Sequence, residues 1–264
     1  MDDRRGGVRA GLAQAALLGL LSLTACGDAA SDLSRLSSGE HGRVTAVRSG
    51  DVVALDSGLT VRLAGVEAPY EGAPGAAAAR TDLAKRVSGR KVELLYGGAR
   101  RDGRGRALAQ LRLEDGTWVQ GALLRDGVVE VRTYADNRAM AAAMLEDEAR
   151  ARIARRGLWG AGVFTVRLPR EIGQGGRDGA QGFQIVEGRV IDVTRTARGT
   201  YLDFTSDHQG FAALVAAPAE PDFEAAGDPL PALKGKLIRL RGPVGWNQVM
   251  RIDHPEQVER LKAG

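Results

Sequence analysis

The chain has 264 residues, enough for two small domains or for one domain with appendages. Hydrophobic residues make up 44% and charged residues 27%, an ordinary globular composition that excludes wholesale disorder. Lys and Arg number 37 against 33 Asp and Glu, and this modest excess gives only a weak bias toward anionic partners.

The N-terminus has the pattern of an export signal. Arg4, Arg5 and Arg9 precede an apolar run over residues 10–23 that is shorter than a typical membrane-spanning helix. The run leads into Leu-Thr-Ala-Cys, which resembles a bacterial lipobox and ends at Cys26, the single cysteine. An incidental buried cysteine is the alternative.

We therefore expect a lipoprotein signal peptide over residues 1–25 and export of the mature chain. Lipid on Cys26 would anchor it to the membrane on the periplasmic side. Gly27 stands where an aspartate would favour inner-membrane retention in lipoproteins of this kind, which slightly favours the outer membrane. Residues 26–40 are small and polar and predict a flexible tether.

The folded pattern begins at His41. Two short apolar segments, residues 52–55 and 59–63, flank the turn Asp56-Ser57-Gly58 and predict a β-hairpin. Within the second segment Val61 and Leu63 share one face, so Arg62 points away from the buried side. Hairpin pairing would bring Asp51 close to Arg62.

Further elements follow at the spacing of a small barrel with helices packed on it. Strands are predicted over residues 91–96, 107–113 and 128–131, and helices over 76–87, 119–125 and about 140–157. Between Arg80 and Arg112 the chain has ten basic residues against three acids, which predicts either an anion-binding face or a solvated basic one.

A second unit is predicted after a glycine-rich linker over residues 161–182. Residues 183–264 show the order β-β-β-α-β-β, which resembles a second, small OB-like barrel. Tyr201, Phe204 and Arg239 are candidates for binding a single strand on its face. The alternative is that these aromatics fill the core of the barrel.

Three segments together resemble the staphylococcal nuclease-like (thermonuclease) family, over about residues 41–160. They are SGDVVALDSGLTVRLAGVEAPY from Ser49, RDGRGRALAQLRLEDGTWVQGALLRDG from Arg101, and LEDEARARIARRGLWG from Leu145. The resemblance implies a mainly β, α+β fold: an OB-fold five-stranded barrel with three helices. It also implies hydrolysis of DNA and RNA phosphodiesters with one calcium ion, and we expect a monomer.

The resemblance also assigns site residues. Asp51, Glu67 and the backbone carbonyl of Ala68 would bind the Ca²⁺ ion, whose flexible coordination accepts such oxygens. Arg62 and Arg106 would bind the scissile phosphate through guanidinium forks. The alternatives are that Asp51 is a turn residue, that Arg62 only pairs with Glu67, and that Arg106 is a solvated loop residue.

Tyr70 departs from the family pattern. The family has there the glutamate that acts as general base, and a phenol is a poor base at neutral pH. Glu71 is the candidate surrogate base, and Arg104 and Tyr134 are candidate substrate-binding residues. Two functions stay open: a membrane-tethered nuclease, and a degenerate relative that binds nucleic acid or a protein without cleaving.

Overall fold

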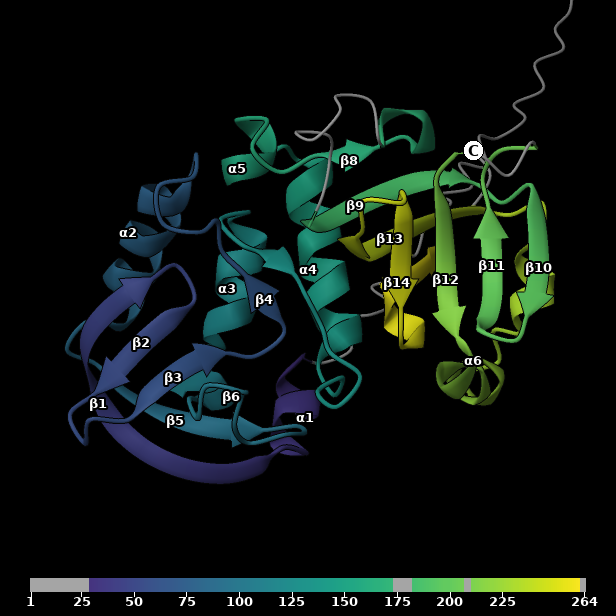
Figure 1. Ribbon diagram of the computed structural model, residues 1–264. Coiled ribbons are helices and arrows are strands. Elements are labelled where there is room, and N and C mark those ends of the chain that lie inside the picture. Colours follow the sequence, from purple (N-terminus) through teal and green to yellow (C-terminus); the bar gives the residue numbers. More distant parts are fainter. Residues whose placement is uncertain (1–28, 173–181, 207–209, 262–264) are drawn as a thin grey trace, which may run out of the picture.

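The computed structural model describes residues 29–172, 182–206 and 210–261 (Figure 1). The predicted signal peptide and Cys26 lie outside these residues, so export and lipidation stay predictions. Within the described ranges no helix is both long enough and apolar enough to cross a membrane.

The first unit is a closed five-stranded barrel. Its strand order is β1 (Ser37–Ser49), β2 (Val52–Leu55), β3 (Thr60–Leu63), β6 (Ala107–Leu113) and β5 (Lys91–Tyr96). Strands β3 and β6 run parallel and the other pairs antiparallel. Alternating apolar residues fill the interior, with Val61, Leu94 and Leu111 fully buried. The expected OB-fold barrel is confirmed.

The three expected helices lie against this barrel: α2 (Ala76–Val87), α3 (Val119–Arg125) and α4 (Ala141–Ile153). Ala76, Ala79, Leu83 and Val87 recur in the sequence at three- and four-residue spacing, as in an amphipathic helix, and α2 buries the last three of them. The short α5 (Gly157–Gly160) follows α4, and β4 (Val66–Glu67) pairs with β7 (Glu130–Val131) beside the barrel.

Residues 29–40 are not a tether, and the prediction of one over 26–40 is wrong for this part. They form α1 (Ala29–Ser34) and the start of β1, which pairs from Ser37 with Tyr96 of β5. Small residues suit this contact, because a Cβ on Gly39 would lie 2.3 Å from Tyr96 Cε2. Strand pairing needs backbone groups rather than apolar side chains, so composition alone misled the prediction.

Glu40 makes this segment sensitive to acid. Tyr96 Oη donates to Glu40 Oε2 at 2.5 Å and Arg101 Nη2 to Oε1 at 2.9 Å. These two hydrogen bonds lower the pKa of Glu40 from 4.5 to about 2, and the bond from Tyr96 has the larger effect. A carboxyl with a lowered folded-state pKa stabilises the fold above its ordinary pKa and loses that contribution as the pH falls through the folded value.

We therefore expect the Tm of Glu40→Gln to depend less on pH in the acid range than the Tm of the wild type. The wild-type Tm should fall more than the variant Tm between about pH 5 and about pH 2.5. Glu114→Gln is the matched control, because Glu114 is exposed and its pair with Lys91 is long, at 3.7 Å. An equal fall in Tm over this pH range in wild type and Glu40→Gln would contradict this role of Glu40.

The second unit is an eight-stranded sheet with the order β10 (Asp192–Thr196), β11 (Gly199–Asp203), β12 (Ala212–Ala216), β14 (Val249–Ile252), β13 (Leu237–Val244), β9 (Gly182–Arg189) and β8 (Val166–Arg167). Strand β15 (Val258–Arg260) pairs with β13. Helix α6 (Glu220–Ala225) lies between β12 and β13 in the chain, with β9 to β12 before it and β13 to β15 after it. The expected β-β-β-α-β-β order therefore places the helix correctly, but it misses the division of the first strand into β9 and β10 and the last strand, β15. The remaining short turns are 3₁₀ helices: η1 (Pro169–Glu171), η3 (Ala217–Ala219), η4 (Leu230–Leu233) and η5 (Pro255–Gln257).

Strands β9 and β10 are two parts of one stretch of chain. Val190 donates its N–H to Lys236 O next to β13, and Ile191 donates to Asp203 O in β11. This stretch therefore bonds on one side to β13 and on the other to β11, as β1 bonds to β5 and β2. With β12 parallel to β14, the strand order repeats that of the first barrel. The topology is OB-like.

The predicted linker over 161–182 is also partly wrong. Residues 161–172 contain β8 and η1, and the Phe164 ring packs on Trp159 with centroids 5.4 Å apart. Ile172 belongs to the core of the second unit. Only residues 173–181 of that stretch lie outside the described residues.

A buried ion pair joins the two units. Helix α4 lies between the barrel and the second sheet (Figure 1). Arg241 of β13 donates through Nη2 to Glu148 Oε2 of α4 at 2.8 Å, and the two side chains are 1% and 0% exposed. Arg241 Nη1 also donates to Val131 O at 3.1 Å, and Thr133 Oγ1 lies 2.7 Å from His254 Nε2. The second unit therefore packs directly behind the β7 segment.

Candidate nucleic-acid interface

A cleft of about 680 Å³ opens on the barrel beside β3 and β4. Arginines outnumber acids in its lining, and three of them come from the basic run between Arg80 and Arg112. The charged lining residues are Arg62, Arg101, Arg104, Arg106 and Arg132 with Asp51, Glu67, Asp102 and Asp136. Anionic ligands are favoured in such a cleft.

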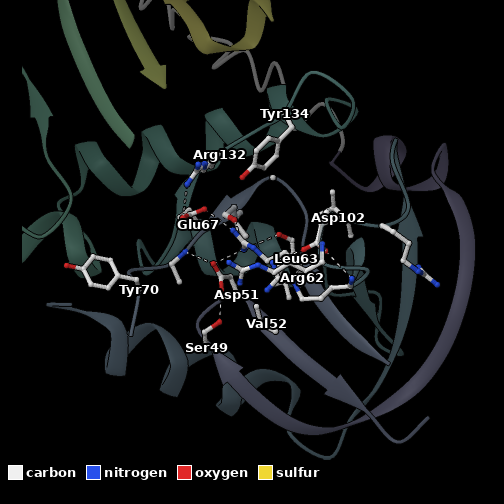
Figure 2. A pocket seen from close by; sticks show the side chains of 18 of the residues that line it. Ser49, Asp51, Val52, Arg62, Leu63, Glu67, Tyr70, Asp102, Arg132 and Tyr134 are labelled. Carbon is white, nitrogen blue, oxygen red and sulfur yellow. Dashed lines mark hydrogen bonds and ion pairs between the residues drawn. The ribbon is translucent and has the colours of Figure 1, made fainter. Parts of the chain in front are cut away.

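The hairpin brings Asp51 and Arg62 together as predicted. Val52 of β2 pairs with Arg62 of β3, which places Asp51 beside the guanidinium. Arg62 Nη1 lies 2.7 Å from Asp51 Oδ2 (Figure 2). Ser49 Oγ donates to Asp51 Oδ1 at 2.6 Å, and Ala68 donates its N–H to Asp51 Oδ2 at 2.9 Å. Asp51 is thus a fixed, buried carboxylate.

Gly50 fixes the approach of this turn to the rest of the site. A Cβ at Gly50 would lie 2.6 Å from the Cβ atoms of both Ala68 and Ala79. Only glycine therefore fits between the β4 segment and helix α2.

Glu67 has two arginine partners. Arg62 Nη2 lies 2.8 Å from Glu67 Oε2, and Arg132 Nη1 lies 2.8 Å from Glu67 Oε1 (Figure 2). The Arg62–Glu67 ion pair of the alternative forms, and Arg62 pairs with Asp51 as well. Arg132 was not among the predicted site residues, although Val131 and Thr133 alternate with Arg132 and Tyr134 in an extended segment. Val131 and Thr133 contact the second unit, whereas Arg132 and Tyr134 line the cleft.

Arg106 also lines the cleft, and it is held by its own loop. Asp102 Oδ2 accepts from Arg106 Nε at 2.7 Å, and Asp102 Oδ1 accepts the N–H groups of Arg104 and Arg106. Although burial acts the other way, these hydrogen bonds lower the pKa of Asp102 below its ordinary value. Arg106 is therefore not the freely solvated loop residue of the alternative.

The remaining predicted residues divide into two groups. Arg104 and Tyr134 line the cleft, and Tyr134 is 41% exposed. Tyr70 is 80% exposed at the rim, with its ring pointing away from Asp51 (Figure 2). Glu71 is exposed and does not line the cleft. The structure therefore leaves the candidate surrogate base outside the site.

The carboxylates of Asp51 and Glu67 fit a hard cation in one respect. Both carboxylates pair with one cationic group, the Arg62 guanidinium, so this position already holds a positive charge. In the described ranges no group of three or more His, Cys, Asp or Glu is placed to hold a metal. A Ca²⁺ ion would therefore need further oxygens from backbone or water, and Arg62 would have to release the carboxylates.

The comparison with known families bears on this cleft. Residues 60–161 match the sequence model of a family described as Staphylococcal nuclease homologue. The same segment forms β3, β6, β5 and the three helices of the closed barrel. The chain carries a staphylococcal nuclease-like domain. None of the curated proteins matches the chain.

Within this staphylococcal nuclease-like domain the match covers Arg62, Glu67, Arg106 and Tyr134 but begins after Asp51. The barrel itself supplies the missing part, since β1 and β2 close it and hold Asp51 at Arg62.

Proposed function

We propose that the staphylococcal nuclease-like domain is a phosphodiesterase that acts on nucleic acid, DNA or RNA. The observation that carries the proposal is the arginine-rich cleft, in which Arg62 lies between two carboxylates and Arg106 faces the same space. Guanidinium groups bind phosphate oxygens bidentately and stabilise charge that develops on them.

Each residue has a distinct task in this proposal. Arg62 and Arg106 bind the non-bridging oxygens of the phosphodiester, and Asp102 orients Arg106. Asp51, Glu67 and the Ala68 carbonyl would hold one Ca²⁺ ion, which supplies Lewis-acid polarisation of the phosphoryl oxygen when bound. Arg132 holds Glu67 in place, and Arg104 and Tyr134 bind the flanking nucleotides.

A second candidate function is binding without cleavage. The position of Tyr70 favours it, because no carboxylate occupies the place of the general base and Glu71 lies outside the cleft. Loss of a general base lowers a rate by about 10²–10⁴. We accordingly propose slow hydrolysis, and binding as the residual function if hydrolysis is absent.

We also propose that the chain is a monomer, exported and anchored by lipid at Cys26. The basic, apolar and lipobox pattern of residues 1–26 supports the anchor. Cys26→Ser should move the protein from the membrane fraction to the soluble fraction, and an unchanged distribution would contradict the anchor.

The experiment measures hydrolysis of labelled single-stranded DNA and RNA by the full chain, with Ca²⁺ and with a chelator. We expect slow cleavage that the chelator abolishes and that Arg106→Met lowers at least ~10²-fold, in the range of a lost charge-stabilising donor. Arg170→Met is the matched control, because Arg170 is exposed and does not line the cleft. Glu71→Gln should leave the rate unchanged.

The outcomes separate the two candidates. Binding without cleavage, in both wild type and Tyr70→Glu, would select the non-cleaving function. Absence of both binding and cleavage would overturn both. Cleavage that persists in the chelator would contradict the proposed ion.

A further inference from the structure

The second unit has a cleft of its own on the outer face of its sheet. It has a volume of about 610 Å³ and lies over β11, β12 and β14. The pairing registers place Tyr201, Leu214 and Arg251 side by side in one row across these strands. Their neighbours along the strands, such as Leu202, Ala213 and Ile252, belong to the core on the other face. The row is therefore directed outward.

Two arginines of this cleft form no ion pair within the described residues. Arg251 interacts electrostatically with Asp253, whose carboxylate is hydrogen-bonded to His254. Arg198 and Arg251 are exposed and line the cleft, and no ion pair holds either guanidinium in the part of the chain that the structure describes. Other arginines of the same unit are neutralised: Arg195 pairs with Glu220, and Arg239 pairs with Glu187 and Glu259. The guanidinium groups of Arg198 and Arg251 are therefore open to an anionic ligand.

An exposed tryptophan stands at the edge of the same cleft. Trp246 is 74% exposed, in the turn between β13 and β14, and its neighbours Gly245 and Asn247 line the cleft. The other two tryptophans, Trp118 and Trp159, are 5% and 7% exposed. An exposed indole beside these two arginines is a platform on which a base can stack.

We propose that this outer cleft binds a single strand of nucleic acid, with bases stacked on Trp246 and Tyr201 and phosphates bound by Arg198 and Arg251. Stacking on aromatics combined with a basic groove is how sequence-tolerant single-strand sites work. The inference rests on the proposed function, since it takes the same class of ligand. It gives the nuclease-like domain a second point of attachment to its substrate, which raises local substrate concentration.

The site differs from the one that the sequence predicted on this unit. Phe204 is 8% exposed and packs on Phe211 with ring centroids 5.3 Å apart, so it fills the core as the alternative held. Arg239 is 11% exposed and paired with two acids. Of the three predicted residues only Tyr201 lies in the cleft.

The test measures binding of a labelled oligothymidylate of about twenty nucleotides to the full chain by fluorescence anisotropy at low salt. We expect Trp246→Ala and Arg251→Met each to weaken binding about tenfold, in the range of one lost stacked base or phosphate contact. Arg170→Met, an exposed arginine that lines neither cleft, should bind like wild type. Stacking should also quench tryptophan fluorescence, and Trp246→Phe should remove that quenching while it preserves binding.

Failure of this inference is distinguishable from failure of the proposed function. If Trp246→Ala and Arg251→Met bind like the Arg170→Met control and quenching survives in Trp246→Phe, the outer cleft is not a nucleic-acid site. Hydrolysis of a dinucleotide, too short to span both clefts, reports on the barrel cleft alone. It should be unchanged in Arg251→Met and lost in Arg106→Met.

Discussion

Tyr70→Glu is expected to raise the rate of single-stranded DNA cleavage by about 10²–10⁴, the usual contribution of a general base. Tyr70 stands at the rim of the cleft that holds Asp51 and Arg62, so a carboxylate there gains access to water next to the bound phosphate. The measurement is kcat for cleavage with Ca²⁺ present. Because Tyr70 is 80% exposed, the substitution should leave the fold intact.

Tyr70→Gln is the matched control for this prediction. Glutamine has the size of glutamate but cannot take a proton, so it separates a new base from simple removal of the phenol. The rate of Tyr70→Gln should stay at the wild-type level. Equal gains in the two variants would show that the ring of Tyr70 obstructs the cleft and that the missing base is not what limits the rate.

Arg241→Met is expected to lower the free energy of unfolding by about 3–5 kcal/mol, the usual cost of leaving a buried charge unpaired. Glu148 would lose this arginine partner in a site with 0% exposure and would keep the Val131 N–H as a donor. Arg152 Nη1 is 3.9 Å from Glu148, too far for a hydrogen bond. The measurement is denaturant unfolding of the full chain.

The double variant Arg241→Met with Glu148→Met tests the cause of that loss. Replacing a buried ion pair by apolar side chains of similar volume is often neutral or stabilising, so more than half of the loss should be recovered. Arg189→Met, an exposed arginine of the neighbouring strand β9, should change little. A double variant less stable than Arg241→Met would contradict the unpaired-charge explanation.

The centre of the site was predictable because its residues are close in the chain. Asp51 and Arg62 belong to one hairpin, and the turn Asp56-Ser57-Gly58 together with apolar alternation fixes the pairing register. Gly58 has a φ of 82°, as such a turn requires. The same local logic predicted helix α2 from the spacing of Ala79, Leu83 and Val87.

Contacts between distant segments were not predictable from local patterns. Arg132 pairs with Glu67, which is 65 residues away in the chain, and Arg241 pairs with Glu148, which is 93 residues away. No periodicity within a short stretch of sequence indicates either pair. One signal was present, since Glu148 shares the buried side of α4 with Met144 and Ala151. A carboxylate on a buried helix face requires a partner, but the sequence does not say which.

The alternation of side chains along a strand also excludes the binding face that was predicted on the second unit. Tyr201 and Phe204 are three residues apart, so in one strand they face opposite sides. Tyr201 lines the outer cleft and Phe204 lies in the core. The two residues could not have formed one binding face, and this much followed from residue spacing alone.

The most direct measurement of the central claim, that the barrel cleft binds a phosphodiester, is the salt dependence of oligonucleotide binding. The slope of log K against log [salt] should fall in magnitude by about 0.7 in Arg106→Met, as expected for one lost phosphate contact to a single strand. Arg170→Met should keep the wild-type slope. An Arg106→Met variant with unchanged affinity and unchanged slope would contradict the claim.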